Sequence, residues 1–172
     1  MRNKRGIPQT FRNPTRGIEL RRATVFDTFD MSAVLTASIR ELCAADHGND
    51  PDRIARWTAN KTPAHIRDWL MGDGEYWVAL CDGHLAAVGA FGENDEHDKI
   101  TLNYVDPRYR FRGLSAALLE KLEDRLRARG IIAARVSSTV TALPFYTARG
   151  WVEAEPPSRG RWIVAHRLTK TL

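Results

Sequence analysis

One stretch constrains the fold more than any other, because a strand, a basic loop and a long helix follow one another directly. The strand is expected over residues 99–105, and Asp106-Pro107 ends it. A helix is predicted from about Ser115 to Arg129, and Gly130 is a typical residue for its C-terminal stop. One face of that helix is a stripe of leucines at four-residue spacing: Leu114, Leu118, Leu122 and Leu126. This succession is typical of a chain that packs helices on a sheet.

The remaining hydrophobic patterns extend this interpretation to the whole chain. Strands are expected over 18–23, 76–81, 84–91, 131–138, 151–155 and 162–168. Helices are expected from Asp27 or Asp30 to about Ala44, and over 51–59, 63–71 and 142–148. The order predicts an α/β (α+β) domain whose mixed, mostly antiparallel central sheet is flanked by helices.

The 172 residues suit one domain, which we place at 17–172, after a flexible basic arm at 1–16. The net charge of +5 is concentrated near the N-terminus, where residues 1–22 hold seven basic side chains and one acidic one. The basic character therefore describes the arm and is weak evidence that the domain binds nucleic acid.

Composition also argues against several classes of protein. No apolar stretch is long enough to span a membrane, and the N-terminus lacks the apolar core of a secretory signal. Cys43 and Cys81 are isolated thiols, which suit a reducing cytoplasm and predict no disulfide framework. The five histidines show no metal-ligand spacing, so we expect no metal site.

The loop at 105–116 has the features of an anion site. The N-terminus of a helix offers backbone N–H groups without partners and a positive partial charge. Gly113 allows close approach of a ligand, Ser115 and Ala116 keep the first turn small, and Arg108, Arg110 and Arg112 add positive charge. Many α/β proteins, however, have such a turn without a ligand, and arginines often only form a solvated face. The loop is neither a Walker loop nor a GxGxxG dinucleotide motif.

The same residues carry a resemblance to a known family. Arg110-Phe111-Arg112-Gly113-Leu114-Ser115 resembles motif A of the GNAT acyltransferases, [QR]-x-x-G-x-[GA], with Ser115 departing from the last position. Residues 102–107 resemble the family's L-x-x-V-x-P strand end. The resemblance implies a GNAT-like sheet in which this strand splays from the next, Tyr104 and Val105 hold the pantetheine arm and the thioester carbonyl, and the amides of Arg112 to Ala116 hold the pyrophosphate. The cofactor-binding residues expected on this basis are Tyr104, Val105, Arg110, Phe111, Arg112, Gly113, Leu114, Ser115 and Ala116.

A second match lies downstream. Residues 142–151 are similar to the family's A-x-x-F-Y-x-x-x-G-F, and the distance along the chain from Gly113 to Tyr146 is typical of the family. The resemblance implies that Tyr146 protonates the leaving thiolate and that the backbone N–H of Val105 contacts the oxyanion. A packing role for Tyr146 beside Phe145 is the alternative. The likeness extends from Ile18 to Trp162 and includes an early SIREL…RIARW segment.

The resemblance implies an N-acetyltransferase that moves an acetyl group from acetyl-CoA to a primary amine, on a small molecule or a protein, by direct attack. A homodimer is common in the family. The general base stays open: the strand at 99–103 carries no carboxylate, Glu93 is the nearest candidate, and a water chain is equally acceptable.

The acceptor is also open. Candidates for contacting it are the acidic loop at 93–98, Trp57, Trp69 and His47, each with a plain structural alternative. Two other functions compete: a non-catalytic CoA-binding regulatory module, and a nucleic-acid or membrane-surface binder that uses residues 1–22. The arm offers few aromatic side chains for base stacking, so nucleic acid is not the expected partner.

Overall fold

The computed structural model describes residues 17–160 and 163–172. Within them one mixed sheet has the strand order β1-β2-β3-β4-β5-β8-β6, and β7 pairs with β8. The strands are β1 (Ile18–Arg22), β2 (Glu75–Cys81), β3 (His84–Phe91), β4 (Lys99–Val105), β5 (Ala133–Ser138), β6 (Val152–Glu153), β7 (Ser158–Arg159) and β8 (Val164–Thr171). The helices are α1 (Thr28–Leu42), α2 (Ala44–His47), α3 (Pro51–Thr58), α4 (Pro63–Leu70), α5 (Leu114–Ala128) and α6 (Leu143–Thr147).

Helices cover both faces of the β1–β4 part of the sheet. On one face, Met31 and Leu35 of α1 and Ile66 of α4 pack against Val78 and Leu102 of the sheet. On the other face the predicted leucine stripe of α5 is buried against the strands. Gly130 follows α5 in a left-handed conformation (φ 77°), as its predicted role in stopping the helix requires. The expected mixed, mostly antiparallel sheet with flanking helices is therefore confirmed.

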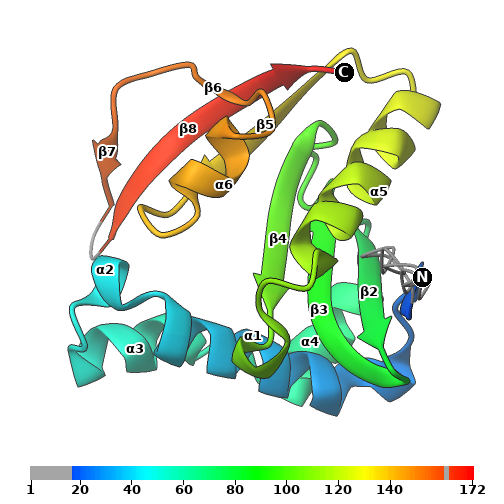
Figure 1. The fold of residues 1–172 in the computed structure, drawn as a ribbon, viewed down its shortest axis with the longest axis vertical. Coiled ribbons are helices and arrows are strands. Elements are labelled where there is room, and N and C mark those ends of the chain that lie inside the picture. Colours follow the sequence, from blue (N-terminus) through cyan, green and yellow to red (C-terminus); the bar gives the residue numbers. More distant parts are fainter. Residues whose placement is uncertain (1–16, 161–162) are drawn as a thin grey trace, which may run out of the picture.

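One strand pair departs from the antiparallel pattern. β4 and β5 run parallel and pair only at Lys99 with Arg135 and at Ile100 with Val136. Beyond these positions the two strands diverge, and Figure 1 shows β5, β8 and α6 leaving β4 toward one side of the molecule. The sheet is thus split into two parts along the length of β4.

The helix expected to reach Ala44 ends earlier, at Leu42. Cys43 leaves the helical conformation, and the short α2 follows it. The side chain of His47 approaches the carbonyl oxygen of Ile39 at 2.9 Å, so this carbonyl already has a partner in the last turn of α1. Helical periodicity does not report this contact.

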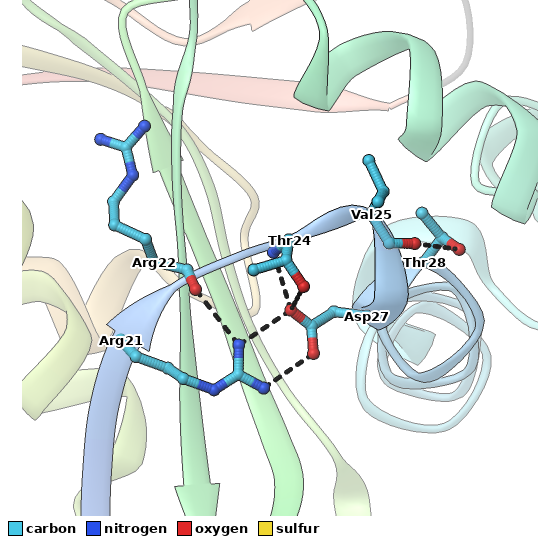
Figure 2. Close-up of polar contacts among 6 residues, drawn as sticks. All are labelled: Arg21, Arg22, Thr24, Val25, Asp27 and Thr28. Carbon is cyan, nitrogen blue, oxygen red and sulfur yellow. Dashed lines mark hydrogen bonds and ion pairs between the residues drawn. The ribbon is translucent and has the colours of Figure 1, made fainter.

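The start of α1 is held by a carboxylate that reaches backwards along the chain. Asp27 stands at the N-cap position, but it does not cap its own helix. Figure 2 shows its carboxylate accepting hydrogen bonds from Arg21 at 2.7 and 2.8 Å and from the Thr24 amide at 2.7 Å. The hydrogen bond from Arg21 lowers the pKa of Asp27. Asp27 therefore ties β1 to α1, whereas the sequence predicted a simple helix cap.

The remaining boundaries agree with the predictions to within a few residues, with two exceptions. The short strand β7 was not predicted. The last strand begins at Val164 and continues to Thr171, beyond the expected end at 168. Trp162, the expected start of that strand, and the arm at 1–16 lie outside the described residues.

Candidate active site

A cavity of about 320 Å³ opens where β4 and β5 diverge, which is within the range of small-molecule sites. Its described walls come from the end of α1, β4, the loop before α5, the first turn of α5, the end of β5 and α6. The lining residues are Ser38, Leu42, Cys43, Ile100, Thr101, Leu102, Asn103, Tyr104, Val105, Tyr109, Arg110, Phe111, Gly113, Leu114, Ser115, Ala116, Val136, Ser137, Ser138, Thr139, Thr141, Ala142, Phe145, Tyr146 and Arg149. The cavity thus brings the two sequence motifs together, although they are far apart in the chain.

The first turn of α5 faces this cavity. Gly113 is the N-cap, with φ 83°, and a Cβ at this position would meet no protein atom within 4 Å. Gly113, Ser115 and Ala116 all line the cavity, so the unpaired amides of the helix start lie at its wall. Phe111 also has a positive φ, of 63°, which is unusual for a bulky residue, and its side chain is 90% exposed. The loop has the open backbone that an anion site needs.

The three loop arginines have different surroundings. Arg110 lines the cavity and lies over the ring of Phe111, with 4.5 Å between its guanidinium carbon and the ring centroid. Arg108 binds Asp106 at 2.7 Å. Arg112 lies 3.7 Å from a carboxylate oxygen of Asp82 and is not among the described lining residues. Of the side-chain charges expected to raise the potential of the loop, only that of Arg110 is presented to the cavity.

β4 directs the backbone N–H groups of alternate residues toward the opening. Asp106 N–H donates to the carbonyl of Ala86 on β3 at 2.8 Å. Since N–H groups of a strand alternate between its two edges, the N–H of Val105 faces the edge that β5 leaves open. The side chain of Tyr104 lies on the face of the sheet that α1 covers, where it packs against Ile39, Cys43 and Trp57. The burial of Tyr104 raises the pKa of its phenol.

Two side chains of β4 carry buried polar atoms without a hydrogen-bond partner, Thr101 Oγ1 and Asn103 Oδ1. Both residues line the cavity, and Thr101 is the extra residue of a β-bulge opposite Phe91. The amide nitrogen of Asn103 donates to the carbonyl of Ser115 at 3.3 Å, which links β4 to the first turn of α5. An unpaired buried oxygen is costly, so these atoms mark a place where a ligand with donor groups is favoured.

Tyr146 lies on α6 and reaches the cavity from the side of β5. Its side chain is 4% exposed and meets the rings of Phe145 and Trp151 edge-on, at centroid distances of 5.2 and 5.6 Å. Burial raises the pKa of its phenol, and a hydrogen bond from Asn103 partly opposes this rise. The expected acid is therefore a protonated phenol beside Asn103, a neighbour that the motifs did not identify.

The candidates for the general base and the acceptor contacts lie elsewhere. Glu93 accepts a hydrogen bond from Tyr76, while Glu96 pairs with Lys99 and Asp98 with Arg135. None of the acidic residues at 93–98 is among the described residues that line the cavity. The expectation that this loop attracts a cationic amine to the site has no geometric support.

The early aromatic residues serve the core. Trp57 packs with Ile39 and Cys43, and Trp69 stacks on Tyr76 with 6.4 Å between ring centroids. His47 is fully buried: its Nδ1 accepts the Asn49 N–H at 3.0 Å, which leaves Nε2 to donate to the carbonyl of Ile39. The alternative reading of these residues as structural ones is the better supported. Burial also raises the pKa of the Cys43 thiol to about 12, so this lining cysteine is not a nucleophile at neutral pH.

In the part of the chain that the structure describes, no three or more His, Cys, Asp or Glu side chains form a group that could hold a metal ion. No helix among these residues is long and apolar enough to cross a membrane.

Comparisons with known proteins agree with this architecture. A family model described as an acetyltransferase (GNAT) domain matches residues 45–172. No curated protein matches the chain. A solved GCN5-related N-acetyltransferase from Rhodopseudomonas palustris is 26% identical with a TM-score of 0.79, and the match covers 90% of this chain and 95% of that one.

Two solved structures with bound CoA species share the fold at lower identity. The PaiA N-acetyltransferase from Thermoplasma acidophilum, in complex with coenzyme A, is 17% identical with a TM-score of 0.75 over 90% of this chain and 99% of that one. The yncA protein from Salmonella typhimurium, with its cofactor acetyl-CoA, is 17% identical with a TM-score of 0.61 over 90% of this chain and 94% of that one.

Proposed function

Since the chain belongs to the GNAT acetyltransferase family, we propose that it transfers an acetyl group from acetyl-CoA to a primary amine by direct attack. One observation carries the proposal: the cavity between the diverging strands β4 and β5 contains both the glycine-led start of α5 and the phenol of Tyr146. The CoA species bound to the relatives from Thermoplasma acidophilum and Salmonella typhimurium support the choice of cosubstrate.

The residues present fit such a cosubstrate. The amides at the start of α5, from Arg112 to Ala116, would hold its pyrophosphate, because a helix N-terminus favours an anion and Gly113 leaves the approach open. Arg110, Phe111 and Leu114 would complete this subsite. The open edge of β4 at Tyr104 and Val105 would pair with its pantetheine arm. Bound there, acetyl-CoA supplies a thioester that a neutral amine can attack.

Two groups of this chain would serve the chemical step. The N–H of Val105 would donate to the oxygen that gains negative charge as the amine attacks. Tyr146 would give its phenolic proton to the departing sulfur, so that the C–S bond breaks as a thiol forms. Because burial raises the pKa of Tyr146, the phenol is protonated at neutral pH and can donate its proton to the departing thiolate.

The acceptor should be an amine with an uncharged, partly apolar body. The charged side chains among the described lining residues are Arg110 and Arg149, and both are cationic. Leu42, Phe145 and the hydroxyls of the segment 137–141 also line the cavity. A polyamine would gain no carboxylate there, whereas a small amine with an apolar body would gain contacts. The amine proton would leave through water, since no lining carboxylate is available among these residues. A cytoplasmic location and a homodimer stay predictions.

The first experiment measures thiol release from acetyl-CoA with a panel of amines that includes phenethylamine, spermidine and a lysine-containing peptide. We expect turnover with phenethylamine and little with spermidine. If none of the amines in the panel gives thiol release while CoA binds tightly, the result would instead favour a non-catalytic CoA-binding module.

Tyr146→Phe separates the enzyme from the binding module. We expect kcat to fall about 10²-fold or more, because an acid in position contributes at least that factor, while the Kd for CoA changes less than about twofold. Tyr76→Phe is the matched control, since it removes a buried phenol that binds Glu93 away from the cavity. Equal kcat values for the two variants would contradict the acid role of Tyr146.

A further inference from the structure

We propose that Asp46 is a positioning residue of the active site, which holds the segment leading to Tyr146 in its reactive place. The inference rests on the proposed function, because its catalytic meaning requires that Tyr146 serve as the acid. The contact joins α2 to a loop 94 residues further along the chain.

The carboxylate of Asp46 binds this loop through three hydrogen bonds, and we call this contact the clamp. Its Oδ1 accepts the backbone N–H of Val140 at 2.7 Å. Its Oδ2 accepts the hydroxyl of Thr141 at 2.5 Å and the backbone N–H of Thr141 at 3.3 Å. Asp46 is 8% exposed, so these bonds replace water around a buried charge. Hydrogen bonds to a charged acceptor of this kind are about twice as strong as neutral ones.

Asp46 stands on a rigid support. The neighbouring His47 is fully buried and uses both ring nitrogens, toward the carbonyl of Ile39 and the amide of Asn49. Gly48 closes α2 in a left-handed conformation and donates its N–H to the carbonyl of Ala44 at 2.8 Å. The buried histidine therefore fixes the short helix that carries the carboxylate, and the clamp is anchored to the end of α1.

The clamped loop continues directly into the helix of the acid. Thr139 Oγ1 accepts the N–H of Ala142 at 3.1 Å, and the carbonyl of Ala142 accepts the N–H of Tyr146 at 3.2 Å. Thr139, Thr141 and Ala142 line the cavity. A shift of the loop would thus move one wall of the cavity and the phenol of Tyr146 together.

The clamp joins the two walls of the cavity where the pairing of the strands does not. Because β4 and β5 pair at only two positions, their ladder cannot set the distance between the two walls further along. Asp46 joins the wall at the end of α1, which includes Leu42 and Cys43, to the wall that carries Tyr146. The carboxylate itself is not among the described lining residues, so it acts through the loop and not on the substrate.

Asp46→Asn tests the proposal with little change in volume. One acceptor oxygen becomes an NH₂ group, which faces an N–H or O–H donor of the loop and cannot accept from it. We expect kcat for acetyl-CoA with phenethylamine to fall at least about tenfold, since small displacements of reacting groups cost this much or more. The KM for acetyl-CoA and the Kd for CoA should stay within about twofold, because Asp46 does not contact the start of α5.

Asp27→Asn is the matched control (Figure 2). Asp27 is 7% exposed and also accepts a backbone N–H and a hydroxyl, both from Thr24, but it lies before α1 and does not line the cavity. We expect it to lower Tm without lowering kcat more than about twofold. A milder variant, Thr141→Val, removes one hydroxyl bond of the clamp and should lower kcat less than Asp46→Asn does. It also tests the clamp if Asp46→Asn does not fold.

Amide hydrogen exchange supplies a readout independent of turnover. In Asp46→Asn we expect faster exchange in residues 139–147 and unchanged exchange in α5. Wild-type kcat and wild-type exchange in the variant would overturn the role of Asp46 and leave the proposed function intact. A parallel loss of kcat in Asp46→Asn and Asp27→Asn, in step with Tm, would reduce Asp46 to a stabilising residue. A wild-type protein that releases no thiol would overturn the proposed function itself.

Discussion

At the scale of single residues, the site depends on groups whose state is set by burial. Tyr146 is enclosed by Phe145 and Trp151, with Asn103 at its hydroxyl. Burial disfavours the charged phenolate and so keeps the proton on the oxygen. The same enclosure that positions the phenol therefore also keeps it in the acid form that the proposed mechanism uses.

This gives an expected pH dependence. Because the pKa of Tyr146 is raised above its ordinary value near 10, the phenol stays protonated over the whole neutral and mildly alkaline range. We expect kcat/KM for the amine to rise with pH up to about pH 10, because a primary amine with a pKa near 10 is still losing its proton over that range. Thiol release measured from pH 6 to 10 checks this. A falling limb centred below about pH 9.5 would show that the acid is a group with a lower pKa.

The residues of the site differ in how far the sequence predicts them. Gly113, Ser115 and Tyr146 belong to local motifs, and their positions relative to helix ends follow from neighbouring residues. Asn103 and Asp46 do not, because their contacts join segments that are distant in sequence. No local pattern in β4, which also contains Lys99 and Thr101, reveals the partner of Asn103.

At the scale of elements, one buried carboxylate ties the sheet to α5. Glu75 at the start of β2 is 1% exposed. It binds Arg22 of β1 at 3.0 Å, Arg125 of α5 at 2.7 Å, and Arg129, which follows α5, at 2.6 Å. Burial alone would raise the pKa of Glu75, but the hydrogen bonds from Arg125 and Trp77 and the charge of Arg22 outweigh it and lower the pKa to about 2. The cluster holds the C-terminal end of α5 while the N-terminal end faces the cavity.

Glu75→Gln should therefore destabilise the protein in a pH-dependent way. At pH 7 we expect a loss of about 2 kcal/mol, or about 4–8 °C in Tm, from the lost charged hydrogen bonds. The folded-state pKa lies below the ordinary value of 4.5, so the contribution of Glu75 is complete above that value and disappears as the pH falls to about 2. Thermal unfolding of both proteins from pH 2 to 7 checks this. A difference in Tm that stays constant over that range would show that the charge of Glu75 is not its source.

Elements were predictable where local patterns decide them. The proline-led helices α3 and α4, the leucine stripe of α5 and the strand β4 follow from spacing and turn residues. The end of α1 lies two residues before the predicted one, where His47 from beyond the helix approaches the carbonyl of Ile39. The two-residue strand β7 is too short for an alternating pattern to detect.

At the scale of the whole molecule, the sequence patterns predict the class of fold but not the order of the sheet. The strand β8 lies between β5 and β6 although both precede it in the chain, and such pairing depends on contacts over long distances in sequence. The divergence of β4 from β5 was implied by the family resemblance alone. It is nevertheless the feature that creates the cavity and on which the proposed function depends.

The central claim is that this cavity binds CoA at the start of α5, and a calorimetric titration of CoA tests it most directly. We expect one-to-one binding in the wild type with a Kd of about 1 μM to 1 mM, the usual range of enzyme affinities for substrates. Gly113→Trp should weaken binding at least about tenfold, because its side chain enters the open space beside the amides. Gly130→Trp is the control, since Gly130 has a similar φ of 77° and equally open surroundings at the far end of α5, and it should bind as the wild type does. Wild-type protein that binds no CoA, or a Gly113→Trp variant that binds it as tightly as the wild type, would contradict the account.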